Sequence, residues 1–130
     1  MSDRSVELLN QIASWPLQKV SDGPRDFFLY AEAASNVSGV SVYQEFGDRA
    51  VWVEPSLSLS EALLELWDIA DADKKWGTLT IIIADYRFTA HFDYLIHLDV
   101  EDDLHDYRKD VLLKRYGTKP IIYPPQPTTH

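Results

Sequence analysis

The sequence contains no cysteine among its 130 residues. Disulfides, zinc–thiolate sites and thiol catalysis are therefore excluded, and the composition is compatible with a reducing compartment. Glycine is scarce as well, with five residues, and none of them belongs to a GxGxxG or GKS/T loop that would cradle a nucleotide phosphate. No serine lies in a GxSxG elbow, so nucleophilic catalysis has no support in the sequence.

Long apolar runs are also missing. No segment approaches the ~18 apolar residues of a membrane-spanning helix. The N-terminal MSDRSVELLNQIASW is polar and helix-patterned, and it lacks the uninterrupted apolar core of a signal peptide. We therefore expect a cytoplasmic protein that makes no contact with a membrane.

Positively charged residues are also few. The chain has 12 Lys and Arg against 21 Asp and Glu, a net charge of −9, and residues 108–130 hold five of the bases. Such a chain repels phosphate backbones, so we expect no nucleic-acid partner. A basic protein is the electrostatically natural partner, although many soluble proteins are this acidic for solubility alone.

The negative charge is densest in HFDYLIHLDVEDDLHDY, residues 91–107, which we call the acidic stretch. It holds six carboxylates and three histidines, with no lysine or arginine. Its last carboxylates begin an expected helix, where each is stabilised by ~0.3–1 kcal/mol. They lie among charged neighbours, which disfavours the perturbed pKa that acid–base catalysis needs. The stretch therefore predicts either a solvated helix start or a surface that meets positive charge.

Two His-x-Asp pairs within the acidic stretch raise the question of a metal. His91 and Asp93 share one face of an expected strand, and His97 and Asp99 repeat the spacing. No HExxH or comparable motif accompanies them. A small metal-dependent enzyme using these four residues remains an alternative, while the expectation is a protein without catalytic residues, metal or cofactor.

Three segments have helical periodicity: 5–15, 58–76 and 101–116. We expect Pro16 to end the first. The second begins with Ser58-x-x-Glu61, which has the pattern of a capping box, and ends with Lys74 and Lys75, which suit the helix dipole. Asp99 is a candidate N-cap for the third helix, and Gly117 a natural stop.

Five segments have the alternation or apolar content of strands: 26–35, 39–46, 49–55, 78–85 and 86–95. The first three are closely spaced and predict an antiparallel meander. Segment 78–85 is almost continuously apolar, so we expect it to be central and covered on both faces. The order α-β-β-β-α-β-β-α predicts an α+β fold with an antiparallel sheet of about five strands and three helices. One domain would span 1–118, followed by a Pro-rich tail, 119–130.

Most aromatic side chains occupy apolar positions of expected elements. Core packing is therefore the expectation for most of the four tryptophans. Tyr43 and Trp52 lie in short strands that could be edges, and exposed aromatic residues of this kind are favoured as interface anchors.

The run KKWGTLTIIIADYRFTAHFDYLIHLD, followed by a charged helix and a basic end, resembles the YezG-like family of bacterial antitoxin and immunity proteins. That family shows Lys/Arg-x-Trp before a central strand, and then a Phe-x-x-x-Phe-x-Tyr strand running into an acidic stretch. Upstream it has a YAE-type strand and a Leu-rich helix with a Trp. The matching residues are Lys74 or Lys75, Trp76, Phe88, Phe92, Asp93, Tyr94 and Asp99 to Asp106, together with Tyr30, Ala31, Glu32 and Trp67; the resemblance covers about residues 5–117.

The resemblance implies an immunity protein that neutralises a cognate toxin C-terminal domain, often a nuclease. A nuclease site is basic because it grips phosphate, and an acidic protein can occupy it or be steered towards it. A general acidic adaptor in a cytoplasmic complex remains a further alternative, and the oligomeric state is open. The expected toxin-binding residues are Asp93, Tyr94, His97, Asp99, Glu101, Asp102, Asp103, Asp106 and Tyr107, with Tyr43 and Trp52 as additional anchors.

Overall fold

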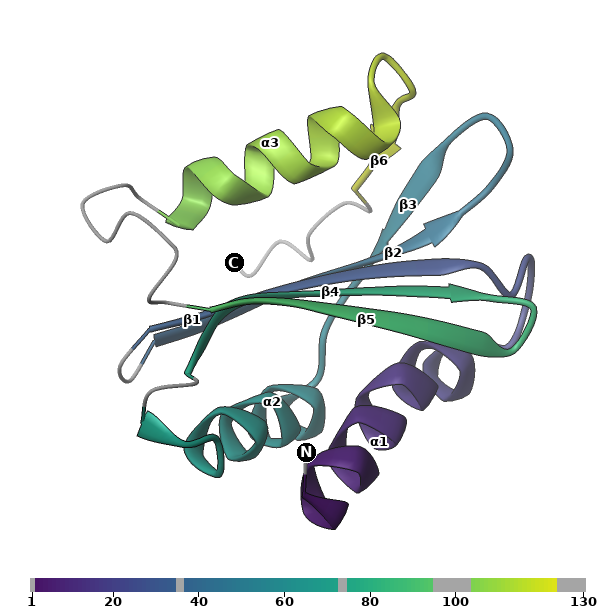
Figure 1. The fold of residues 1–130 in the computed structure, drawn as a ribbon. Coiled ribbons are helices and arrows are strands. Elements are labelled where there is room, and N and C mark those ends of the chain that lie inside the picture. The colour runs from purple at the N-terminus through teal and green to yellow at the C-terminus, as the bar shows by residue number, and fades with distance from the viewer. Residues whose placement is uncertain (1, 35–36, 73–74, 95–103, 124–130) are drawn as a thin grey trace, which may run out of the picture.

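The computed structural model describes residues 2–34, 37–72, 75–94 and 104–123, and Figure 1 shows their arrangement. Within this part of the chain three helices and five strands follow one another in the order that the periodicity predicts, and a sixth, short strand follows at the end. The elements are α1 (Asp3–Lys19), β1 (Phe27–Ala34), β2 (Val37–Glu45), β3 (Ala50–Val53), α2 (Leu57–Asp68), β4 (Trp76–Ala84), β5 (Arg87–Tyr94), α3 (Leu104–Tyr116) and β6 (Ile121–Ile122).

The strands form one sheet in the order β5-β4-β1-β2-β3-β6. Every neighbouring pair is antiparallel except β3 and β6, which are parallel. The α+β class with a mostly antiparallel sheet is therefore confirmed. The expected strand number was one too low, because Ile121 and Ile122 of the Pro-rich tail pair with Ala50 and Val51 and extend the sheet.

The helices lie on both faces of this sheet, α1 and α2 on one side and α3 on the other (Figure 1). Since side chains of a strand alternate between faces, β1 contributes to two separate cores. Phe27 and Leu29 belong to the core beneath α1 and α2. Phe28 and Tyr30 belong to the core beneath α3. The sheet is consequently covered on both sides at its centre.

Strand β4 illustrates this double burial. It lies between β5 and β1, as its continuous apolar sequence predicts. Leu79 and Ile81 pack into the α1–α2 core, while Ile82 packs against the α3 core. The expectation of an interior strand covered on both faces is confirmed.

Helix α1 continues past the residue that was expected to end it. Pro16 lies inside the last turn, the helix runs on to Lys19, and the Val20 N–H donates to the Pro16 carbonyl. Proline forfeits one backbone hydrogen bond within a helix. Here the Pro16 side chain is buried, and burial of its apolar surface is favourable.

Helix α2 begins and ends earlier than its sequence predicts. Ser56, not Ser58, is the N-cap, and its hydroxyl accepts from the Leu59 N–H. The helix ends at Asp68, so no lysine lies in its last turn. Lys75 still satisfies the helix end from outside, because its Nζ donates to the carbonyls of Trp67 and Asp68 at 2.6 and 3.0 Å. Lys74 lies outside the described residues.

Helix α3 closes the second face of the sheet. Val111 and Leu112 pack against its core, as the helical period predicts. Gly117 adopts a left-handed backbone, φ 57°, and its N–H donates to the Leu113 carbonyl. This confirms Gly117 as the residue that stops the helix. None of the helices in the described ranges has the length and apolar content required to cross a membrane.

Candidate partner-binding pocket

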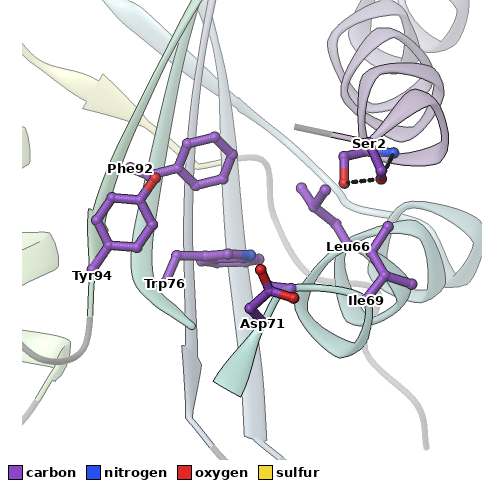
Figure 2. A pocket seen from close by; sticks show the side chains of 9 residues that line it. Ser2, Leu66, Ile69, Asp71, Trp76, Phe92 and Tyr94 are labelled. Atoms are coloured by element: carbon purple, nitrogen blue, oxygen red, sulfur yellow. Dashed lines mark hydrogen bonds between the residues drawn. The ribbon is translucent and has the colours of Figure 1, made fainter. Parts of the chain in front are cut away.

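A pocket of about 330 Å³ opens where the start of β4 and the end of β5 meet the N-terminus of α1 and the C-terminus of α2 (Figure 2). We call it the aromatic pocket. Four segments that are distant in sequence contribute to it. Its lining residues are Ser2, Ser5, Leu66, Ile69, Ala70, Asp71, Trp76, Phe92 and Tyr94.

The aromatic wall of the pocket depends on an irregularity in β4. Trp76 pairs with Tyr94 and Thr78 pairs with Asp93, so Gly77 is an extra residue on the β4 side. Such a bulge re-aims the side chain beside it. Without the bulge, Trp76 would point to the α3 side like Thr78. With it, Trp76 joins the α1–α2 core and lies on the same face as Tyr94.

Three rings form a continuous surface on this wall. The Phe92 ring is a neighbour of both others: its centroid is 6.1 Å from that of Trp76 and 6.3 Å from that of Tyr94. The Phe92 and Tyr94 rings are stacked, with 23° between their planes. Tyr94 is partly exposed at the rim, whereas Trp76 is only 2% exposed at the base. The accessible parts of the Phe92 and Tyr94 rings offer a site for a cation, which the ring quadrupoles attract.

The backbone carbonyl of Trp76 has a hydrogen-bond partner, whereas its side chain has none within the described residues. Its carbonyl accepts from the Trp67 indole N–H at 3.0 Å. Its own buried indole N–H has no hydrogen-bond partner within the described residues. A buried donor without an acceptor costs ~1–3 kcal/mol. An acceptor atom placed beside this ring would therefore be stabilising; since lysine and arginine side chains have no acceptor, a backbone carbonyl of a bound chain would have to supply it.

Besides the Tyr94 hydroxyl and the Trp76 indole N–H, the polar side chains that line the pocket are the Asp71 carboxylate and the hydroxyls of Ser2 and Ser5. Asp71 is exposed, and Figure 2 shows its carboxylate on the side of the Trp76 ring that carries the nitrogen. It follows the C-terminus of α2, where the helix dipole is negative. Ser2 caps α1, since its hydroxyl accepts from the Ser5 N–H at 3.1 Å. A pocket with aromatic faces and one carboxylate suits a lysine or arginine side chain better than an anion.

Asp93 and Tyr94, the first two residues of the predicted binding site, point their side chains to opposite faces of the sheet at the end of β5. Tyr94 belongs to the aromatic pocket, while Asp93 points to the opposite, α3-facing side. There the Asp93 carboxylate accepts from the Thr78 hydroxyl at 3.1 Å and pairs with the His91 ring at 3.2 Å. The expectation that His91 and Asp93 share a strand face is confirmed.

The other members of the predicted metal site cannot be placed beside this pair. His97 and Asp99 lie outside the described residues. Within the residues that are described, no group of three or more His, Asp or Glu side chains is arranged to hold a metal ion. The geometry thus gives the His91–Asp93 pair a polar contact on an exposed strand face.

The structure describes the remaining acidic residues of the predicted site only in part. Glu101, Asp102 and Asp103 lie outside the described residues. Asp106 and Tyr107 lie near the start of α3, but the positions of their side chains are outside the description. The acidic stretch therefore connects β5 to α3 by its place in the chain, starting at the strand that forms the pocket wall.

The two expected aromatic anchors lie elsewhere. Tyr43 is 1% exposed, so the expectation that it lies at an exposed edge is wrong. The reason is that β2 is an interior strand, covered by α3 and by the tail: the Tyr43 ring contacts Tyr116 and Tyr123. Trp52 is half-buried on the same face and contacts Tyr123. Neither residue lines the aromatic pocket.

Sequence reasoning did not identify Ser2, Ser5 and Asp71 as candidate site residues. Trp76 was expected to pack in the core and was one of the residues that match the YezG-like pattern. Nothing in the sequence connected it with Asp71. Only the bulge at Gly77 could have indicated the altered direction of Trp76, and glycine within a strand is a general sign of a bulge. No periodicity could place the N-terminus of α1 beside the end of β5.

A scan of the sequence against protein-family models finds no match, and a search of curated proteins finds none. The resemblance to the YezG-like family consequently stays a prediction that rests on the residues quoted for it.

Proposed function

We propose that this protein is an immunity protein, which binds and neutralises a basic toxin domain in the cytoplasm. The observation that carries the proposal is the adjacency of two features at one end of β5. The strand ends in the aromatic wall of the pocket, and the acidic stretch begins within the same strand. A basic domain would meet a negative surface and a pocket for one of its cationic side chains together.

The two features have different tasks in this proposal. Exposed carboxylates act mainly on the rate of association, because opposite potentials steer the partners together. Affinity depends on a few buried anchors at the centre of an interface. The aromatic pocket supplies such an anchor position, because its lining combines the Phe92 and Tyr94 rings with the Asp71 carboxylate, and both kinds of group attract a cation. A nuclease-type toxin fits this chemistry, since its phosphate-binding surface carries Lys and Arg.

The overall charge supports the same class of partner. The net charge is −9, and residues 77–107 contain seven acids and one base. A protein with this distribution is repelled by nucleic acid and attracted by a nucleic-acid-binding surface. An immunity protein for a nuclease needs both properties.

Co-expression tests the proposal directly. The chain would carry an affinity tag and be expressed beside the products of its neighbouring reading frames, with mass spectrometry of whatever is retained. We expect a one-to-one complex with a basic domain that is released as salt rises. The same domain expressed alone should arrest growth, and this protein should restore it. Retention of no partner, or a captured domain without toxicity, would contradict the proposal.

Two pocket variants make the test specific. Tyr94→Ala removes the partly exposed ring at the rim, and Asp71→Lys reverses the carboxylate. Both should weaken retention of the partner while leaving the fold intact, because both side chains are exposed. Glu54→Lys is the matched control: it reverses an exposed carboxylate just before α2, at the end of that helix away from the pocket.

A further inference from the structure

Strand β5 forms one edge of the sheet. It has eight residues and pairs only with β4 among the described elements. The opposite edge, β6, has only two residues. A long edge strand presents a row of unpaired N–H and C=O groups to another chain. The outer side of β5 is therefore able to accept a further strand.

The turn that precedes β5 determines which of its residues face the open edge. Asp85 and Tyr86 have positive φ angles of 54° and 61°, which is the two-residue type I′ turn of a tight hairpin. Ala84 and Arg87 flank this turn and pair with each other. In a two-residue hairpin such flanking residues exchange both hydrogen bonds, and bonded and non-bonded pairs then alternate.

The alternation of bonded and non-bonded pairs divides the residues of β5 into two sets. Arg87, Thr89, His91 and Asp93 direct their backbone groups to β4. Phe88, Ala90 and Phe92 direct their N–H and C=O groups to the open edge. The side chains divide in the same way: the first set points to the α3 side of the sheet and the second to the α1–α2 side.

We propose that β5 pairs antiparallel with β5 of a second copy of this chain, around a two-fold axis at Ala90. Ala90 then faces Ala90 of the second copy, and Phe88 faces Phe92. All three residues belong to the set whose backbone groups point outwards, so every inter-chain hydrogen bond of this register forms. The two sheets become one continuous sheet through both molecules. This inference depends on β5 alone and does not require the proposed function.

Charge complementarity favours a second copy as the occupant. In this register Arg87 lies opposite Asp93 of the second copy, and the symmetry produces this pair twice. Arg87 is exposed and makes no ion pair within the described part of the chain. It is also the one base among residues 77–107. Directly opposed residues of a non-bonded pair have Cβ atoms ≈ 4.5–5.5 Å apart, within reach of an arginine and an aspartate.

The other face of the paired strands is apolar. Phe88 is 39% exposed in the single molecule. Pairing places its ring beside Phe92 of the second copy, and aromatic pairs of this kind stabilise antiparallel strands. The same register therefore matches charge on one face and aromatic rings on the other. A strand of unrelated sequence would have to supply both patterns.

Sedimentation equilibrium of the full chain tests the pairing. The wild type should have twice the mass of the 14.9 kDa chain. Arg87→Asp and Asp93→Arg each create two like-charge pairs and should raise the dimer dissociation constant about tenfold or more. The double variant R87D/D93R restores opposite charges and should return the constant towards the wild-type value. Glu54→Arg, which reverses an exposed charge away from β5, should leave it unchanged.

Ala90→Pro tests the backbone part of the inference. The Ala90 N–H points to the open edge, so proline there removes no hydrogen bond within the single molecule. It removes two bonds across the two-fold axis, and we expect a monomer with unchanged circular dichroism. A monomeric wild type, single variants with the wild-type dissociation constant, or a double variant that dimerises no more tightly than the single ones would each overturn the register. Should Ala90→Pro not fold, the charge variants decide alone.

Discussion

Arg115 donates two hydrogen bonds to Glu45, from Nε to Oε2 at 2.6 Å and from Nη2 to Oε1 at 2.7 Å. This bidentate pair joins the end of α3 to the end of β2. The guanidinium also lies over the Phe28 ring, 4.7 Å from its centroid. The side chains are 29% and 18% exposed, so water screens the pair less than it would at the surface.

We expect Arg115→Met to lower the free energy of unfolding by about 1–3 kcal/mol, because it leaves the Glu45 carboxylate half-buried without its partner. Arg115→Lys retains the positive charge but cannot make the two parallel hydrogen bonds of the guanidinium. We therefore expect a smaller loss of unfolding free energy than for Arg115→Met. Urea unfolding followed by circular dichroism measures both. Arg49→Met is the control, since it breaks a more exposed pair with Asp48 and should cost roughly 0–1 kcal/mol. Equal losses at both sites would show that α3 is not held by this pair.

The start of α2 supports a second prediction. The Ser56 hydroxyl accepts from the Leu59 N–H and from the Trp15 indole N–H, the latter at 2.9 Å. Ser56→Ala should therefore cost about 1–2 kcal/mol of stability. Ser58→Ala should cost less than about 0.5 kcal/mol, because within the described residues the Ser58 hydroxyl has a hydrogen bond with the Ser56 hydroxyl and caps no helix N–H. Thermal unfolding of the two variants in parallel gives the comparison, and the reverse order would assign the cap to Ser58.

A third prediction concerns alkaline pH. Burial raises the pKa of Tyr30, Tyr43 and Tyr116 above the ordinary tyrosine value; Glu32 adds to the effect at Tyr30, the Tyr123 hydroxyl at Tyr43 and Glu45 at Tyr116. Between the unfolded and folded pKa values the folded chain retains protons that the unfolded chain has lost. The stabilisation is therefore complete below pH about 10 and decreases as pH rises above it.

The decrease should approach about 1.4 kcal/mol per pH unit for each buried tyrosine. Urea unfolding at a series of alkaline pH values measures this slope, and the tyrosinate absorbance of the three buried side chains should appear together with loss of circular dichroism. Tyr116→Phe removes one of the three ionisable groups, so the free energy of unfolding should fall less steeply with pH, by about 1.4 kcal/mol per pH unit. Tyr86→Phe is the control, because Tyr86 is exposed. Ionisation of all tyrosines while the protein stays folded would contradict the burial of these three.

Much of the fold could be predicted from the sequence because its elements have strong patterns of their own. The alternation in β1 and the continuous apolar run of β4 are properties of single segments, and both predictions were confirmed. The position of the α2 cap was ambiguous, because Ser56 and Ser58 both precede the apolar stripe. Strand β6 was missed, because two residues have no periodicity and their pairing depends on β3.

The candidate site was less accessible to sequence reasoning, and the reasons are geometric. Tyr43 was assigned to an exposed edge, because a sequence does not show that a distant helix and tail cover its strand. The aromatic pocket depends on the bulge at Gly77 and on contact between α1, α2 and β5. These are long-range relationships that no local pattern contains. Asp93 and Tyr94 were predicted together, yet the strand places their side chains on opposite faces.

The measurement that tests the central claim most directly is the binding kinetics of this protein with its captured basic partner, by surface plasmon resonance. For the double variant D71K/Y94A we expect dissociation to accelerate by roughly thirtyfold, as loss of an anchor worth about 2 kcal/mol requires, with a smaller change in association that comes from the single charge reversal at Asp71. Reversing Asp102, Asp103 and Asp106 to lysine should instead slow association. Dissociation of the pocket variant at the wild-type rate, matching the Glu54→Lys control, would contradict the assignment of the aromatic pocket as the anchor site.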